Sequence, residues 1–131
     1  MRNVLLMFVL ASLSTACVSV SKSILTHDYR MDPVARDEVY VFFAYDEICE
    51  HDRIAILAAE GDEDLTSEGQ MIDRLREEAG KLGANAIVLN HVEEPGGGER
   101  VVAAATGDSA ERRGQAVAIR CVDDLGRFGR R

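Results

Sequence analysis

Three cysteines, Cys17, Cys49 and Cys121, are the side chains of this sequence with the widest chemical range. A thiol can be acylated, can join a second thiol in a disulfide, or can bind a soft metal ion as the thiolate. Cys17 follows an apolar run at residues 4–13 (VLLMFVLASL), which is preceded by the positive charge of Arg2. This run is too short to span a bilayer, which takes about 20 residues, but it suits the core of a secretory signal. The sequence therefore predicts export, and the cysteines need separate explanations.

Small residues run directly into the first cysteine, in the order Leu13-Ser14-Thr15-Ala16-Cys17. This stretch resembles the lipobox of bacterial lipoproteins. The resemblance implies that residues 1–16 are a lipoprotein signal peptide and that the sulfur of Cys17 carries a diacylglycerol. Two acyl chains anchor a protein stably, where one would be marginal. The residue after the cysteine, a valine, is similar to an outer-membrane sorting signal, so we expect a protein anchored in the outer membrane and facing the periplasm.

The other two cysteines favour a disulfide between Cys49 and Cys121, because an exported protein folds in an oxidising compartment. A bridge that closes a loop of about 70 residues would stabilise the fold by about 4 kcal/mol on a chain-entropy argument. The alternative is a small-ligand or metal site in which Cys49 acts with His51 and nearby carboxylates. Neither thiol lies in a C-x-x-C motif, and a structural zinc site needs four ligands, usually in close pairs. We therefore expect a structural bridge, with no cofactor and no metal.

Other arrangements that could support catalysis or ligand binding are incomplete. A calcium loop of the EF-hand type that begins at Asp62 would need Gly and Glu where Ser67 and Asp73 stand. The glycines at 96–98 lack the Lys-Ser/Thr of a phosphate-binding loop, and no serine lies in a G-x-S-x-G motif. The carboxylates at 62–64 are better explained as a solvated cluster before a helix. We do not expect an enzyme.

Composition narrows the class of protein further. The 131 residues carry 15 Lys and Arg against 23 Asp and Glu, a net charge of −8, which argues against a nucleic-acid partner. The length fits one domain. The C-terminal part is locally basic, which could bring it to anionic lipid or lipopolysaccharide or could simply aid solubility. The arginines concerned are Arg112, Arg113, Arg127, Arg130 and Arg131.

The elements that must position these residues follow from periodicity. Residues 17–37 have no sustained period and contain Pro33, which predicts a lipid-anchored tether. Ser67 and Gln70 form a capping box, and Gly83 is placed to end a helix whose apolar stripe is Ile72, Leu75, Ala79 and Leu82. Strands are predicted at 38–44 (EVYVFFA), 52–59 (DRIAILAA), 85–92 (NAIVLNHV), 100–106 (RVVAAAT) and 115–122 (QAVAIRCV). A flexible tail is predicted at 123–131.

The predicted order over residues 38–122 is β-β-α-β-β-β. With one helix available, its apolar stripe must cover one face of a largely antiparallel sheet, which is an α+β two-layer sandwich. Residues 74–89 (RLREEAGKLGANAIVL) resemble a signature of small bacterial envelope proteins, in which a helix ends in A-x-x-x-G-A-N-A before a hydrophobic strand. Residues 115–119 (QAVAI) are similar to the last strand of the Rcs envelope-stress sensor lipoprotein.

The placement of Cys49 and Cys121 is similar to that in an uncharacterised family of bacterial lipoproteins. The Rcs sensor has a further cysteine in a region that corresponds to residues 90–94, and this chain has none there. The resemblance therefore implies an envelope lipoprotein with a small α+β domain, without transferring the sensor's activity. We expect a non-catalytic accessory or sensing domain that acts through contacts with another envelope protein. The alternative function is the ligand- or metal-binding module around Cys49 and His51.

Overall fold

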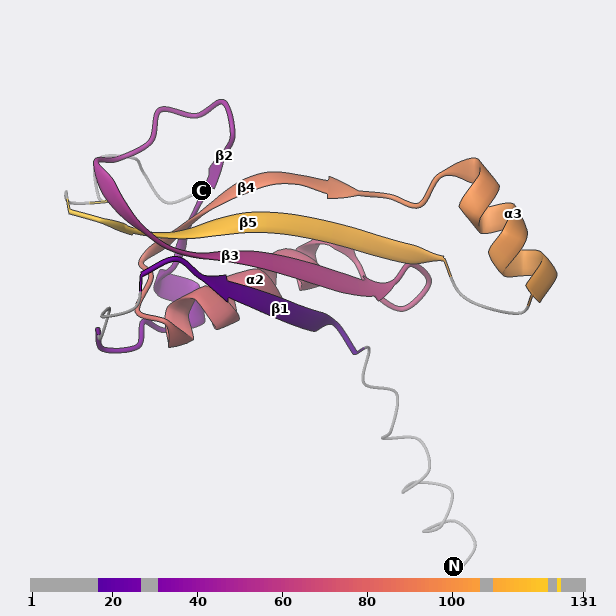
Figure 1. The fold of residues 1–131 in the computed structure, drawn as a ribbon, viewed down its shortest axis with the longest axis horizontal. Coiled ribbons are helices and arrows are strands. Elements are labelled where there is room, and N and C mark those ends of the chain that lie inside the picture. The colour runs from indigo at the N-terminus through magenta and orange to yellow at the C-terminus, as the bar shows by residue number, and fades with distance from the viewer. Residues whose placement is uncertain (1–16, 27–30, 107–109, 123–124, 126–131) are drawn as a thin grey trace, which may run out of the picture.

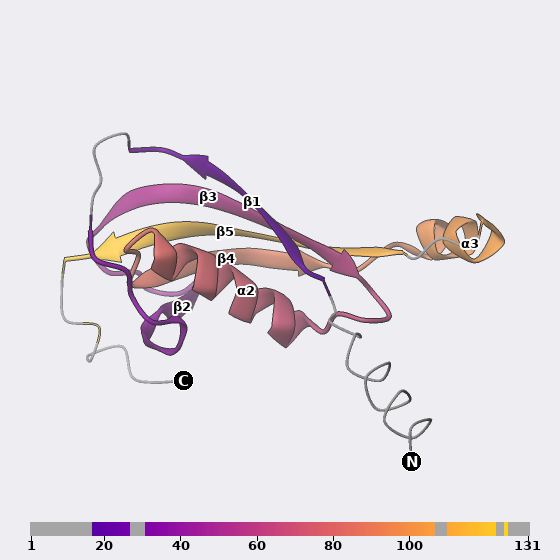
Figure 2. The same ribbon diagram turned by 90° about the horizontal axis from the view of Figure 1, so that it is seen from below.

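A computed structural model describes residues 17–26, 31–106, 110–122 and 125, and these residues form a single sheet with a helix on one face (Figures 1 and 2). The five strands are β1 (Ser19–Ile24), β2 (Tyr40–Phe43), β3 (His51–Asp62), β4 (Ala86–Glu93) and β5 (Glu111–Cys121). The helices are α2 (Glu68–Lys81) and α3 (Gly97–Thr106), and a short 3-10 turn, η1 (Arg36–Glu38), precedes β2. The signal peptide predicted at 1–16 lies outside the described residues.

The strands lie in the order β1-β3-β5-β4-β2. Neighbouring strands are antiparallel except for β2 and β4, which run parallel. Helix α2 packs on one face of this sheet, with its main contacts to β3 and β4 (Figure 2). The predicted fold class, an α+β arrangement with a helix on a largely antiparallel sheet, is confirmed.

Helix α2 begins and ends where the local sequence signals predict. The Ser67 side chain accepts a hydrogen bond from the backbone N–H of Gln70, and the Gln70 side chain accepts one from the backbone N–H of Ser67. Gly83 has a φ of 81°, the left-handed conformation that favours glycine just after a helix. The buried side of the helix is centred on Met71, Leu75 and Ala79, slightly rotated from the predicted stripe.

The tether predicted for residues 17–37 is corrected by the structure. Residues 19–24 form β1, which pairs with β3 from Ser19 opposite Glu60 to Ile24 opposite Ala55. Val18 and Val20 turn toward the α2 side of the sheet, where both join the core. The pattern V-S-V-S-K-S-I does alternate with the period of a strand, but it is short and mostly polar, so pairing with β3 decides its structure. The folded domain therefore begins next to Cys17.

The prediction of a strand at 100–106 is also wrong, because these residues belong to helix α3. Two of the three glycines at 96–98, Gly97 and Gly98, are the first two residues of this helix. Strands β4 and β5 pair directly with each other, so the segment between them has no free strand to join. The order of elements is therefore β-β-β-α-β-α-β. Within the predicted tail, Leu125 packs on the core around the disulfide, and the other residues of 123–131 lie outside the described part of the chain.

The core has two parts, one on each face of the sheet. The larger lies between the sheet and α2 and includes Leu57, Ile87 and Ala116. The smaller lies on the opposite face and is built from Phe42, Cys49, Ala86, Ile119 and Cys121. This second cluster covers one end of that face. Farther along β3, Ile56 remains 37% exposed.

Candidate functional site

The residues predicted to do chemistry lie at opposite ends of the sheet. Cys17 precedes β1 at the end where α3 projects, and we call this the anchor end (Figure 1). Cys49 and Cys121 lie at the far end of β3 and β5, which we call the disulfide end. Cys17 is exposed and takes no part in a disulfide. Among the described residues, no helix is both long enough and apolar enough to cross a membrane.

A shallow hollow connects Cys17 to acidic residues from three other elements of the anchor end. Its lining includes Ser19 of β1, Glu60 and Asp62 of β3, Glu99 of α3 and Glu111 of β5. Its charged lining is therefore entirely acidic. No group of three or more metal-binding side chains is arranged around a common point in the described part of the chain.

The carboxylates at the end of β3 and just after it stabilise the local chain, as expected for a cluster that precedes a helix. An Asp62 carboxylate oxygen accepts a hydrogen bond from the backbone N–H of Asp64 at 2.9 Å. Glu63 forms an ion pair with Arg100 of α3, and the hydrogen bond from Arg100 lowers the pKa of the Glu63 carboxyl. This pair attaches α3 to the turn that follows β3.

The two described arginines of the basic C-terminal set both have partners within the domain. Arg112 lies 3.2 Å from a carboxylate oxygen of Glu94 and donates a hydrogen bond to the carbonyl of Thr66. Arg113 lies 3.1 Å from Glu111. The contacts of Arg112 join β5 to the segments that follow β3 and β4, whereas the Arg113–Glu111 pair lies within β5. The other three, Arg127, Arg130 and Arg131, lie outside the described residues.

A nearly buried carboxylate attaches the anchor strand to α2. Glu78 of α2 lies 2.7 Å from the ammonium nitrogen of Lys22 on β1 and 2.7 Å from that of Lys81. The Glu78 side chain is 10% exposed. Hydrogen bonds from Lys22 and then Lys81 lower its pKa from 4.5 to about 2. Because Lys22 follows Cys17 by five positions, this pair helps to hold the strand that would emerge from a lipid anchor.

We expect Glu78→Gln to lower the free energy of unfolding by about 2 kcal/mol at pH 7, a value reduced from the full pKa shift because Lys22 is partly exposed. A lowered pKa means that Glu78 stabilises the fold fully above pH 4.5 and loses this contribution as the pH falls toward about 2. The difference in unfolding free energy between the wild type and the variant should therefore become smaller as the pH falls through that range. Urea unfolding at several pH values measures it.

The matched control is Glu77→Gln on the same helix. Glu77 also pairs with Lys81, at 2.9 Å, but its side chain is 35% exposed, so we expect a loss of less than about 1 kcal/mol. A Glu78→Gln effect that does not change between pH 7 and pH 2 would contradict the role given to this carboxylate.

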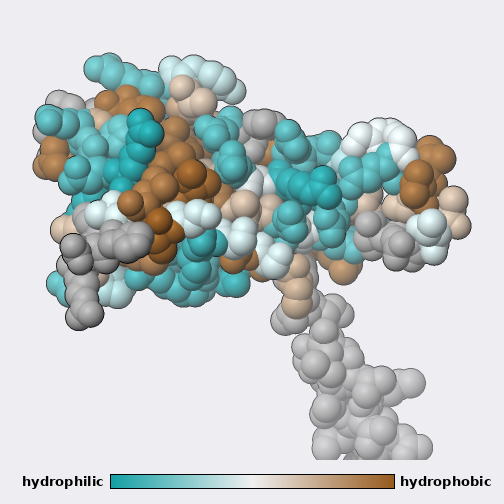
Figure 3. All heavy atoms as spheres, in the orientation of Figure 1, coloured by the Kyte–Doolittle hydropathy of each residue, from teal (hydrophilic) through white to brown (hydrophobic). Residues whose placement is uncertain are grey.

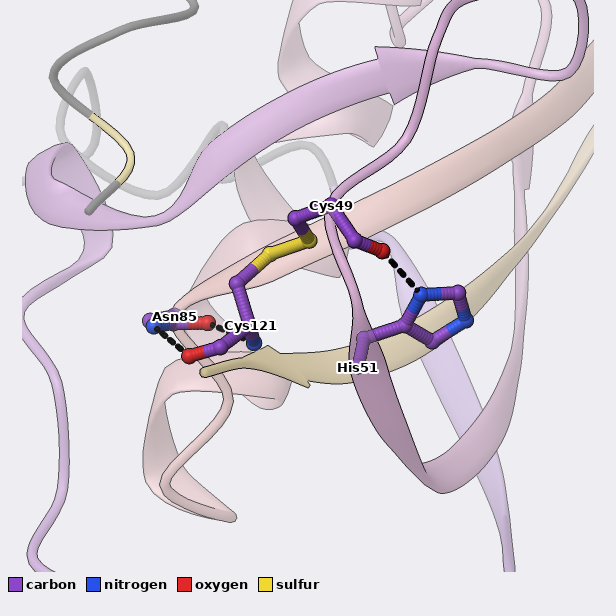
Figure 4. The surroundings of a disulfide bond; sticks show 4 residues. All are labelled: Cys49, His51, Asn85 and Cys121. Atoms are coloured by element: carbon purple, nitrogen blue, oxygen red, sulfur yellow. Dashed lines mark hydrogen bonds between the residues drawn. A yellow bond between two sulfur atoms is a disulfide. The ribbon is translucent and has the colours of Figure 1, made fainter. Parts of the chain in front are cut away.

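At the disulfide end, the predicted cysteine pair is brought to bonding distance (Figure 4). The Cα atoms of Cys49 and Cys121 lie 5.6 Å apart, and both residues are buried. Asn85 holds the backbone of Cys121 by two hydrogen bonds. Its side-chain oxygen accepts from the Cys121 N–H at 2.8 Å, and its side-chain nitrogen donates to the Cys121 carbonyl at 3.1 Å. Asn85 was visible in the G-A-N-A signature, but this role was not predicted from the sequence.

His51 lies beside the disulfide. Its Nδ1 atom is 2.7 Å from the carbonyl oxygen of Cys49 (Figure 4). The bridge removes the Cys49 thiolate, which was the central ligand of the alternative metal site. One ring nitrogen of His51 is also hydrogen-bonded to the carbonyl of Cys49. The disulfide end is therefore a structural site. The disulfide joins the chain before β3 to the end of β5, and Asn85 joins the chain before β4 to the same place.

Comparisons with known proteins bear on the fold. No protein-family model matches the chain, and no curated protein matches it. Among solved structures, the chain is similar to the Francisella virulence factor FvfA, with a TM-score of 0.56 and 11% sequence identity. The alignment covers 77% of this chain and 96% of the FvfA chain. At this identity, the similarity shows a shared fold.

Proposed function

We propose that this chain is a bacterial envelope lipoprotein whose small domain is held at a membrane by a lipid on Cys17. The observation that carries the proposal is the position of this cysteine. It is exposed, unbridged and separated from β1 by a single residue, at the end of the sheet opposite the disulfide. A lipid on Cys17 would hold the domain directly at the membrane, because β1 begins almost at the point of attachment. The lipobox-like sequence before Cys17 and the two chains of a diacylglycerol support stable anchoring.

We further propose that the domain acts through contacts with another envelope protein, without catalysis. Support comes from the face of the sheet opposite α2. Figure 3 shows this face, on which apolar surface lies beside polar surface. Ile56 of β3 is exposed there, and Val88 and Val117 are only partly buried. Exposed apolar groups on a sheet face suit contact with another protein. The bridged cysteines leave the metal-binding alternative without its thiolate ligand.

Cys17→Ser tests the anchor. We expect the wild type to fractionate with membranes and the variant to be recovered in the soluble fraction, because a serine hydroxyl cannot take the thioether-linked diacylglycerol. Mass spectrometry of the wild-type N-terminus should show the lipid on a chain that begins at Cys17. Unchanged fractionation of Cys17→Ser together with a wild-type N-terminus that carries no lipid would contradict the proposal.

Cells that carry the wild type or Cys17→Ser also test the proposed contact with another envelope protein. Chemical crosslinking of intact envelopes should give a discrete adduct with the wild type that is lost with Cys17→Ser, since release from the membrane removes the domain from its neighbour. Unfolding by urea should be alike for both proteins, because Cys17 is exposed and forms no bond within the domain. An adduct that persists unchanged in the variant would show that the contact does not depend on the membrane.

A further inference from the structure

We infer that helix α3 is a second membrane contact, whose outer apolar face lies against the lipid surface beside the anchored Cys17. This inference rests on the proposed lipid anchor and goes beyond it, because it assigns a second, non-covalent site of lipid contact. It also sets the orientation of the domain, with the anchor end at the membrane and the disulfide end away from it.

The first observation is that α3 stands apart from the rest of the domain. It lies beyond the ends of β4 and β5 and crosses the line of the strands (Figures 1 and 2). Among its ten residues, only Ala103 is buried. Val101 is 70% exposed and Val102 is 62% exposed, and Figure 3 shows apolar surface at this tip.

The second observation is that the outer side of α3, opposite the buried Ala103, is uncharged. Gly98, Val101, Val102 and Ala105 fall at i, i+3, i+4 and i+7, which places them on one face of the helix. The charges of α3, Glu99 and Arg100, lie in its first turn, and Arg100 pairs with Glu63 and Glu94 of the domain. A helix that faced only water would be expected to show polar side chains on this side. An apolar outer face on a helix that projects from a domain suits an interfacial position.

The third observation is the position of α3 beside the anchor. Glu99 of α3 and Cys17 line the same hollow. A lipid that enters the bilayer from Cys17 would therefore bring α3 to the membrane surface. Arg100 holds the helix to the turn after β3, so its place relative to Cys17 is defined by the fold.

Charge favours a lipid surface over a protein partner for α3, and it selects the kind of lipid. Of the acidic side chains that line the hollow at the anchor end, Glu60, Asp62 and Glu111 belong to the sheet. The fourth, Glu99, lies in the first turn of α3, and the outer face of the helix has no charge with which a protein could pair. These carboxylates would be repelled by an anionic surface. Contact with zwitterionic headgroups is therefore expected. Two valines give a weak contact, which becomes effective because the lipid on Cys17 holds the helix in place.

A tryptophan reporter tests the inference, since the chain has no tryptophan of its own. We would reconstitute the full lipidated chain in phosphatidylcholine vesicles with brominated acyl chains, which quench tryptophan fluorescence on contact. The test variant is Val102→Trp. The matched control is Val122→Trp, because Val122 is 64% exposed, follows β5 and lies at the disulfide end. We expect quenching of Val102→Trp by about half or more, and of Val122→Trp by less than about a tenth, as for a helix whose face is buried in the interface.

The outcomes separate the two proposals. If Val102→Trp floats with the vesicles but is not quenched, the inference about α3 is overturned and the anchor stands. If the wild-type protein does not float with the vesicles, the proposed lipid anchor itself fails. Equal quenching of both reporters would overturn the proposed orientation, in which the anchor end lies at the membrane and the disulfide end lies away from it. Should Val102→Trp fail to fold, as judged by circular dichroism, Val101→Trp on the same exposed face replaces it.

Discussion

Replacing Cys49 and Cys121 together by alanine should lower the free energy of unfolding by about 4 kcal/mol. The two residues are 72 positions apart, so the bridge constrains a large loop of the unfolded chain. Domains of this size are stable by about 5–15 kcal/mol in total, so a loss of this size would remove a large part of their stability. Urea unfolding of the purified protein, with and without the two substitutions, measures the effect.

The control for this experiment is Cys17→Ser, which removes the exposed third thiol and should leave the unfolding free energy unchanged. In this background the protein should show no thiol that reacts with an alkylating reagent after unfolding without reductant. Two reactive thiols, or a loss of less than about 1 kcal/mol in the double alanine variant, would show that the bridge does not stabilise the fold as the chain-entropy argument requires.

Gly80→Ala should destabilise the protein by about 3 kcal/mol, although alanine normally stabilises the interior of a helix relative to glycine. A Cβ atom at Gly80 would overlap with the carbonyl oxygen of Val34, which is backbone and cannot rotate away. It would also lie 3.3 Å from Cγ2 of Val39. Val34 crosses α2 closely here, because its N–H donates a hydrogen bond to the carbonyl of Gly80 at 2.9 Å. The added methyl group must therefore push the segment before β2 away from the helix.

Gly69→Ala is the matched control, because this glycine lies in the first turn of the same helix with open space around it. The nearest atom to a Cβ there would be Oγ of Ser67, at 3.9 Å. We expect a gain of up to about 1 kcal/mol from helix propensity. Thermal or urea unfolding of both variants gives the comparison. A Gly80→Ala protein as stable as Gly69→Ala would mean that the close approach of Val34 to α2 is not required by the fold.

Helix α2 and the sheet class could be predicted from the sequence because the signals that specify them are local. The Ser67 and Gln70 capping box and Gly83 lie within a few residues of the backbone groups they affect. The strand predicted at 115–122 is likewise specified locally, because its residues alternate: Ala116 and Ala118 lie in one core cluster, and Ile119 and Cys121 lie in the other.

Strand β1 and helix α3 could not be predicted in the same way, because distant strands decide both. Residues 19–24 become a strand by pairing with β3, more than 30 positions later. Residues 101–106 combine valines, which favour strands, with alanines, which favour helices. The direct pairing of β4 with β5 excludes a strand between them, so helix propensity prevails.

The sequence by itself determined the chemical character of the candidate sites: a cysteine after a signal-like run, and two cysteines suited to a bridge. Only the tertiary structure decided where these residues lie. It set Cys17 directly beside a paired strand and near Glu99 in the first turn of α3, and it placed Asn85 against Cys121 at the opposite end. The physical reason is that side-chain chemistry and helix signals are properties of neighbouring residues. Strand pairing, by contrast, joins segments far apart in the chain, and that pairing determines which residues meet.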